Sequence, residues 1–382
     1  MDDSALQPRF LAAIDDIDAQ AWDALAADAN PFVRHAFLAG LERHGCIRPE
    51  WGWRAHHLAL YHHDRLIAAA PLYLKTNSRG EFVFDWGWAH AWEEAGGRYY
   101  PKLLSAVPYS PVTGPRLLAG AGPNAAHLRK QLAAAIVGET QRIGLSSAHA
   151  NFLADDEADA FSAEWLPRFD WQFHWHNRGY GDFDDFLAEL RHKKRKNIRQ
   201  ERAQAQANVE CSMQRGDSLN DDDWHTVHAL YRHTFEEKGN FATLSLDFFR
   251  HLARELGDGL QLALARRKGD ILAMALFLRG DNTLYGRYWG CAENLPALHF
   301  ELCYYLGIEY AIDQRLACFE PGAQGEHKIA RGFLPVRTHS RHFIAHAGFR
   351  AAVARALQHE AIALEAYRTD LLAHSPYAEK SR

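Results

Sequence analysis

The sequence has few cysteines, and none of them lies in a CxxC pair. The 382 residues include five cysteines, at positions 46, 211, 291, 303 and 318. Disulfide-stabilised secreted folds and structural zinc modules both depend on closely spaced cysteine pairs, so this spacing argues against both classes. An odd number of scattered thiols suits a reducing compartment, and we therefore expect a cytoplasmic protein.

Long apolar runs are also lacking. No stretch approaches the roughly 18 apolar residues that a membrane-spanning helix needs. The first residues, MDDSALQPRF, are acidic and have no apolar core of the kind found in a secretory signal. We expect no integral membrane association.

Positive charge is not in excess, because the formal net charge is −5 at pH 7. A protein that binds DNA broadly through its phosphates usually carries a basic surface, so DNA is not an expected partner. Any anionic partner has to be held by a local basic patch.

Several familiar catalytic motifs are missing. No GxSxG occurs, and histidine pairs such as His174 and His176 lack the carboxylate spacing of HExxH, so we expect neither a serine hydrolase nor a metal site. The segment GAGPNA (120–125) resembles a dinucleotide loop, but it lacks a parallel βαβ context and Pro123 occupies a phosphate-facing position.

The chain that remains is an ordinary globular one. With 47% hydrophobic and 24% charged residues it can bury a full core, and its length predicts two domains. Both halves show helix, antiparallel strands, helix and strand, which predicts a duplicated α+β unit. The clearest expected elements are strands at 56–63, 64–75, 81–90 and 173–180, helices at 124–143, 182–206 and 297–314, and a hairpin over 261–290 with turns at KGD and GDN.

The segment RHKKRKNIRQER (191–202) is strongly basic, with Ile198 as its one apolar residue. A solvated helix face and a phosphate-binding surface both fit this composition. The charge order also suits the helix macrodipole without any ligand, because acidic residues precede the basic ones. Arg195 and Arg199 fall on one helical face and, with Lys196 beside them, are candidate phosphate contacts.

The segment FEPGAQGEHKIARGF (319–333) contains the densest group of functional residue types. It follows an apolar strand and combines a glycine turn with Glu320, His327, Lys328 and Arg331. Backbone amides near Gly325 can approach a ligand closely, and the charged side chains can hold negative charge or move a proton. A tight turn with surface charges is the alternative interpretation.

Two further groups are candidates. In LYGRYWG (284–290), Tyr285, Arg287 and Trp289 are candidate substrate-binding residues, and Tyr285 and Arg287 could point into a cleft. Structural packing is the safer interpretation of Tyr288 and Trp289. Glu301 lies in a mostly apolar helix, and burial of its carboxylate would raise its pKa and suit it as a base.

Taken in order, NPFVRHAFL, AAPLYLK, EFVFDW, YYPKLL, LYGRYWG, LHFELCYY and FEPGAQGEHKIARGF make the chain resemble the FemAB-like family of bacterial N-acyltransferases, over about residues 20 to 365. The resemblance implies an α+β fold of two tandem GNAT-like (acyl-CoA N-acyltransferase-like) domains with mixed sheets. We expect these domains at 1–168 and 169–338, with the segment 339–382 packing back on the first domain.

The resemblance further implies acyl or aminoacyl transfer to an amine, with peptidoglycan precursor metabolism as the family setting. HKIARGF is similar to the lysine-containing F-K-x-G-F segment of Fem-type enzymes, which assigns a phosphate- or carbonyl-contacting role to Lys328. Acyl-CoA or aminoacyl-tRNA is the expected donor, and a small molecule or an envelope precursor is the expected acceptor. The alternative is a non-catalytic protein that binds a phosphorylated carrier, an envelope precursor or tRNA through the basic segment.

Overall fold

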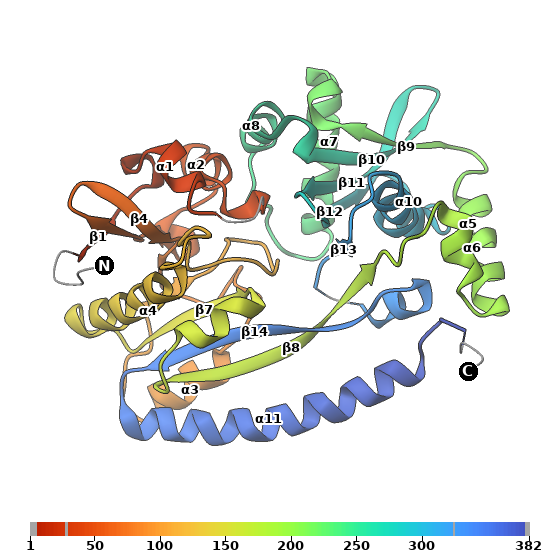
Figure 1. Cartoon of the computed structure of the whole chain (residues 1–382). Helices are drawn as coiled ribbons and strands as arrows, with labels where there is room; N and C mark the ends of the chain where they lie inside the picture. The colour runs from red at the N-terminus through yellow and green to blue at the C-terminus, as the bar shows by residue number, and fades with distance from the viewer. Residues whose placement is uncertain (1–5, 27–29, 324, 379–382) are drawn as a thin grey trace. The chain divides into compact units, whose positions relative to one another are not determined.

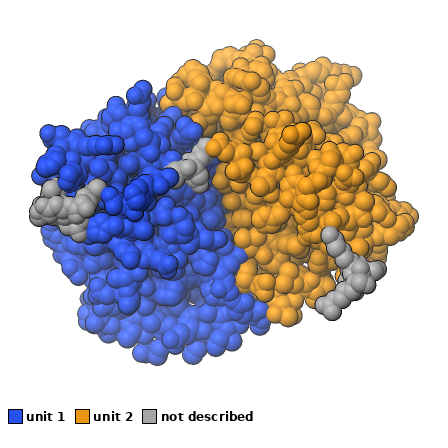
Figure 2. All heavy atoms as spheres, in the orientation of Figure 1, with its two compact units in different colours: residues 1–170, 337–366 blue, residues 171–336, 367–382 orange. Residues whose placement is uncertain are grey.

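The computed structural model describes residues 6–26, 30–323 and 325–378, which form two compact units. Unit 1 comprises residues 1–170 and 337–366, and unit 2 comprises residues 171–336 and 367–382 (Figure 2). The chain passes between them within strands β8 (Trp165–His176) and β14 (Leu334–Ile344) and within helix α11 (Ala347–Ala373). The last crossing falls inside the segment 339–382, while the domain limits expected from the sequence stay predictions.

Unit 1 contains a small and a larger set of paired strands (Figure 1). Its elements are β1 (Leu6–Leu11), α1 (Ala19–Asp23), α2 (His35–Arg43), β2 (Trp53–Ala55), β3 (His57–His62), β4 (Arg65–Ala70), β5 (Tyr73–Lys75), α3 (Trp86–Glu94), β6 (Lys102–Ser105), α4 (Ala125–Arg142) and β7 (Ser147–Leu153). Strand β3 pairs with β1 on one side and with β4 on the other, and β2, β5, β6, β7 and β14 pair in that order. An apolar core that includes Leu103, Leu132 and Ile136 packs α4 on these strands.

Unit 2 has its own paired strands, in the order β8, β13, β12, β11, β10, β9. Its elements are α5 (Phe183–Ala188), α6 (His192–Ala205), β9 (Glu210–Arg215), α7 (Asp221–Glu236), α8 (Leu246–Leu256), β10 (Leu260–Arg267), β11 (Asp270–Arg279), β12 (Thr283–Cys291), α9 (Leu298–Phe300), α10 (Leu306–Asp313) and β13 (Cys318–Glu320). Glycines allow helices to approach β12 and β13 closely, since a Cβ on Gly290 would lie 2.4 Å from the Leu230 carbonyl oxygen of α7.

The two units repeat one connection. In unit 1, β5 and β6 are antiparallel, β6 and β7 are parallel, and helix α4 lies between the parallel strands in the chain. In unit 2, β11 and β12 are antiparallel, β12 and β13 are parallel, and the helical segment 298–313 joins the parallel strands. A parallel pair needs such a crossover, so the duplication expected from the sequence is confirmed in the topology.

Four local predictions have definite outcomes. The hairpin over 261–290 is confirmed as β10, β11 and β12, and the helix at 124–143 is confirmed as α4. The single helix at 182–206 is wrong, because α5 ends at Ala188 and α6 begins at His192. The strand at 81–90 is also wrong, because helix α3 occupies its second half.

Candidate functional site

A pocket of about 240 Å³ lies in unit 2 where the parallel strands β12 and β13 separate. Their pairing ends at Tyr285 opposite Glu320. The residue that follows β13 is Pro321, which has no N–H to donate to a ladder, and a Cβ on the opposing Gly286 would lie 3.2 Å from the Pro321 Cα. The residues beyond this point, 286–289 on one side and 321–323 on the other, line the pocket.

The wall that follows β12 is helical. Between α9 and α10 the backbone forms a π-helical turn over Glu301–Tyr305. Such turns are rare and insert an extra residue, which redirects side chains relative to a regular helix. Cys303 and Tyr304 of this turn line the pocket together with His299.

Lys328 is the buried cation of the pocket. Only 2% of its surface is exposed, and its Nζ donates a hydrogen bond to the Gly322 carbonyl oxygen at 2.6 Å. Burial lowers the pKa of Lys328 to about 8, and the positive charge of Arg287 contributes in the same direction. An ammonium group with so little hydration interacts strongly with any negative charge that develops beside it.

His327 lies next to Lys328 on the same wall and is exposed to solvent. Its Nε2 is 2.9 Å from the Tyr304 hydroxyl oxygen. Partial burial of the ring, followed by the charges of Arg331 and Lys328, lowers the pKa of His327 and so favours the neutral ring, which can accept a proton. Gly325 has φ +115°, and a Cβ there would lie 2.4 Å from His327 Cε1, so the turn requires glycine for this ring position.

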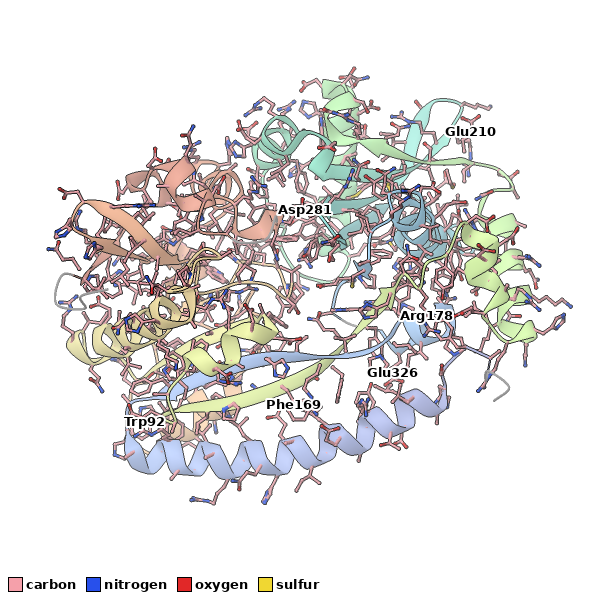
Figure 3. All side chains as sticks on the ribbon, viewed as in Figure 1. Trp92, Phe169, Arg178, Glu210, Asp281 and Glu326 are labelled. Carbon is pink, nitrogen blue, oxygen red and sulfur yellow. The ribbon has the colours of Figure 1, made fainter. Side chains whose placement is uncertain are left out.

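The pocket therefore brings together four of the predicted site residues: Arg287, Trp289, His327 and Lys328. Gly325 shapes the same turn without lining the pocket. Glu326, labelled in Figure 3, accepts a hydrogen bond from the Tyr367 hydroxyl at 2.5 Å and so ties the turn to helix α11 within unit 2. Whether these residues bind substrate stays a prediction.

Glu301 does not line the pocket. Its side chain is fully buried, and its carboxylate accepts hydrogen bonds from the Arg202 guanidinium at 3.0 Å and from the Gln206 amide at 2.8 Å. Burial raises the pKa of Glu301, and the hydrogen bonds from Arg202 partly offset this effect. These hydrogen bonds hold α6 against the π-helical turn, so Glu301 has a structural role.

We therefore expect the Glu301→Gln variant to lose stability and to keep its activity. The neutral amide places an N–H near the Arg202 guanidinium and leaves buried hydrogen-bonding groups unsatisfied, at a cost of about 1–3 kcal/mol. Urea unfolding measures this loss. The transfer rate per folded molecule should stay within about threefold of the original, because a true base at this position would contribute about 10²–10⁴-fold.

Three other predicted residues lie outside the pocket lining. Arg331 donates to the His327 carbonyl oxygen and to the Glu201 carboxylate, both at 2.8 Å. The Glu320 carboxylate lies 3.9 Å from His174 Nε2, and Tyr285 is buried within β12. Through these two hydrogen bonds Arg331 stabilises the turn. The roles of Glu320 and Tyr285 stay predictions.

The predicted basic group lies on α6, away from the pocket lining. Lys196 and Arg199 are exposed and Arg195 is half-buried. Arg199 forms an ion pair with Asp184 at 2.7 Å, so part of the charge is neutralised within the protein. The contact between this surface and an anionic partner remains a prediction.

Sequence reasoning missed a buried charged network in unit 1. The Lys102 ammonium, with no exposed surface, donates to Asp85 at 2.6 Å, to Glu81 at 2.9 Å and to the Ser78 hydroxyl at 3.0 Å. Burial alone would lower the pKa of Lys102, but the two carboxylates raise it, so it stays charged. Lys75 lies directly across the β5–β6 ladder from Lys102.

One sequence signal could have revealed this network. Both lysines interrupt apolar strands, in APLYLK and YYPKLL, where a core position normally excludes charge. The groups that accept hydrogen bonds from Lys102 lie in the segment 78–85, just before helix α3. Their proximity to the strands depends on the fold and cannot be inferred from the sequence.

The fold of the two units is that of tandem GNAT-like domains, an α+β arrangement with mixed sheets. Within this class, a model of the FemAB_like family, described as peptidoglycan biosynthesis/recognition, matches residues 13–379. The chain belongs to this family. Among the residues that the structure describes, no helix is both long and apolar enough to cross a membrane.

Solved structures agree on the fold at low sequence identity. FemX is 12% identical with a TM-score of 0.50, and the match covers 88% of this chain and 98% of that chain. The C-terminal domain of a predicted lysylphosphatidylglycerol synthetase from Agrobacterium fabrum is 11% identical with a TM-score of 0.51, covering 88% and 94%. A search of curated proteins found no match.

Proposed function

We propose that the protein is an N-acyltransferase or aminoacyltransferase that transfers an acyl group to an amine in the pocket of unit 2. The observation that carries the proposal is the buried Lys328 ammonium beside Arg287, at the point where two parallel strands separate. A carbonyl group placed there meets a poorly hydrated cation as its oxygen becomes negative.

The chemistry divides among three groups. The acceptor amine attacks the acyl carbonyl carbon, the new C–N bond forms, and the bond to the donor oxygen or sulfur breaks. Lys328 stabilises the oxyanion of the tetrahedral intermediate, while Arg287 holds the donor or acceptor phosphate. His327, whose lowered pKa favours the neutral ring and which is hydrogen-bonded to Tyr304, takes the proton that the amine loses.

The donor is acyl-CoA or aminoacyl-tRNA, and the acceptor is a small molecule or an envelope precursor. The family description, peptidoglycan biosynthesis/recognition, supports a peptidoglycan precursor as acceptor. The segment CAENLPAL (291–298), which leads into α9, contains no glycine and so lacks the pyrophosphate loop of CoA-dependent GNAT enzymes. This difference favours the aminoacyl-tRNA donor.

A thermal-shift series tests the donor and acceptor directly. A ligand at 100 times its Kd stabilises the native state by about 2.7 kcal/mol, which is an easily measured rise in melting temperature. We expect a rise with aminoacyl-tRNA or with a UDP-linked peptidoglycan precursor, and little with acetyl-CoA. A rise with acetyl-CoA alone, abolished in Lys328→Ala, would instead assign a CoA-dependent acetyltransferase.

The basic face of α6 supports a second candidate function, in which the protein binds an anionic carrier or tRNA without turnover. Its observation is the exposure of Lys193 and Lys196 on the same helix as the half-buried Arg195. Binding of this kind weakens steeply with salt. Binding that is salt-dependent and unaccompanied by acyl transfer would favour this candidate.

A further inference from the structure

Three potential metal ligands meet on adjacent strands of unit 2, although the sequence alone predicts no metal site. A ligand atom from each of His174, Cys318 and Glu320 lies within 4.8 Å of the other two. His174 is buried, and the other two are half-buried. These three residues lie close to the pocket, because Pro321 and Gly322, which directly follow Glu320, line the pocket.

Strand register explains why these residues meet. In the antiparallel β8–β13 pair, Cys318 is opposite His176 and Phe319 is opposite Trp175. Continuing this register places Glu320 opposite His174. Because side chains alternate between the two faces of a strand, Cys318, Glu320 and His174 all project from the same face. More than 140 residues of sequence separate the histidine from the other two, so no spacing motif could reveal the group.

We propose that His174, Cys318 and Glu320 bind a divalent cation of the zinc type. Zinc accepts imidazole nitrogen, thiolate sulfur and carboxylate oxygen, whereas magnesium and calcium prefer oxygen alone. With the thiolate and the carboxylate ionised, the three ligands carry two negative charges and neutralise the cation. The proposal does not depend on the transfer reaction proposed above.

The protonation state of the histidine suits a ligand. Burial, followed by the nearby His176 and Lys328, lowers the pKa of His174 to about 3, so its imidazole is neutral. Burial raises the pKa of Cys318, so the free thiol holds its proton until a metal displaces it to solvent. The Gln172 side-chain oxygen lies 3.3 Å from His174 Nε2, and this hydrogen bond has to break before Nε2 can bind a metal ion.

The distances require only small movements. Tetrahedral zinc with these ligand types separates its donor atoms by about 3.3–3.6 Å, from bond lengths of about 2.0–2.3 Å. His174 Nε2 and Glu320 Oε2 are 3.9 Å apart, and all three ligand atoms lie within 4.8 Å of one another, so shifts of about 1 Å would bring them to the separation that a bound zinc ion requires. Three protein ligands leave the fourth position for water or another donor.

Titration of the metal-free full-length protein with Zn²⁺, in competition with a chromophoric chelator, tests the proposal. We expect about one equivalent to bind tightly, and binding weaker by about tenfold or more in each of Cys318→Ser, His174→Gln and Glu320→Gln. Cys211→Ser is the matched control, because Cys211 is also a half-buried strand cysteine of unit 2 and lies outside the group.

Cobalt substitution separates this site from adventitious binding to the many histidines of the chain. Thiolate coordination of Co²⁺ produces a charge-transfer absorption that histidine and carboxylate ligands do not. We expect this band in the original protein and in Cys211→Ser, and no band in Cys318→Ser. Absence of the band in the original protein, or its persistence in Cys318→Ser, overturns the proposal even if His174→Gln fails to fold.

Discussion

Replacing Lys328 with alanine is expected to lower the transfer rate by about 10²–10³-fold, which is the loss typical for removal of one oxyanion-stabilising donor. The Lys328 side chain is the most deeply buried cation of the pocket, with 2% of its surface exposed. The stability of the protein should change little, because the ammonium makes one hydrogen bond to a backbone oxygen and its burial in charged form is costly. Initial rates together with urea unfolding separate these effects.

The pH dependence gives a second readout of the same role. Because burial lowers the pKa of Lys328 to about 8, the cation is lost as the pH rises through this value, and the rate should fall above about pH 8. Lys328→Arg keeps its charge at all accessible pH values and should remove this alkaline fall, even if its rate is lower. A Lys328→Ala variant with unchanged rate, or an alkaline fall that persists in Lys328→Arg, would exclude Lys328 as the group that titrates.

The duplicated topology was predictable because it depends on local patterns. The hairpin β10–β11–β12 is specified by alternating apolar residues and by glycine at the KGD and GDN turns, and α4 by apolar residues at helical spacing. These signals act within about 20 residues and do not require the rest of the fold.

The break between α5 and α6 shows the opposite case. The Arg191 N–H donates to the Pro376 carbonyl oxygen, and the Ala378 N–H donates to the Glu189 carbonyl oxygen, each at 2.9 Å. The segment near the C-terminus thus takes the backbone groups that a continuous helix would pair internally. Local propensity over 182–206 favours one helix, and a contact with a segment nearly 190 residues away overrides it.

The wrong strand at 81–90 has a different cause. The apolar–polar alternation of this segment predicts a strand, but Phe82 and Phe84 are exposed and do not face a core. The informative spacing was Trp88 and Trp92, four residues apart on one helical face. Trp88 packs edge-on against His342, and Trp92, labelled in Figure 3, stacks on Phe349, so α3 is fixed by unit 1 residues from the far end of the chain.

The sequence predicts the glycine-containing turn of the candidate site but not the helical segment that forms another side of the pocket. The glycines and charges of 319–333 predict a ligand-binding turn, and in the structure Lys328 and His327 line a pocket. Glu301 was chosen as a base because a carboxylate in an apolar helix is unusual. The structure gives it a partner, Arg202, on a helix about 100 residues earlier, and the π-helical turn that directs Tyr304 to the pocket has no sequence signature.

The largest expected effect on stability comes from Lys102→Met in unit 1. The substitution leaves Asp85 and Glu81, both nearly without exposed surface, with no cation between them. Removing one partner of a buried ion pair costs about 3–5 kcal/mol, because the remaining charge is neither hydrated nor compensated. Equilibrium urea unfolding at pH 7.5 should show this loss as a lower midpoint than that of the original protein.

Lys75→Met is the matched control, since Lys75 is also a fully buried lysine and lies directly across the ladder. Burial, together with the charge of Lys102, lowers the pKa of Lys75 to about 7, so it carries only part of a charge at neutral pH. Its Nζ donates to the Arg79 carbonyl oxygen and lies 3.7 Å from the centre of the Trp53 ring, which a methionine side chain can also pack against. We expect a change of less than about 1 kcal/mol.

The same pair of variants shows whether charge or packing is responsible. In Lys102→Met the two carboxyl groups bind protons more tightly in the folded than in the unfolded state, so the folded variant loses stability as the pH rises through their raised pKa values. The deficit relative to the original protein should therefore be smaller at pH 5 than at pH 8. A deficit independent of pH, or equal losses in Lys102→Met and Lys75→Met, would mean that lost packing and not an uncompensated charge destabilises unit 1.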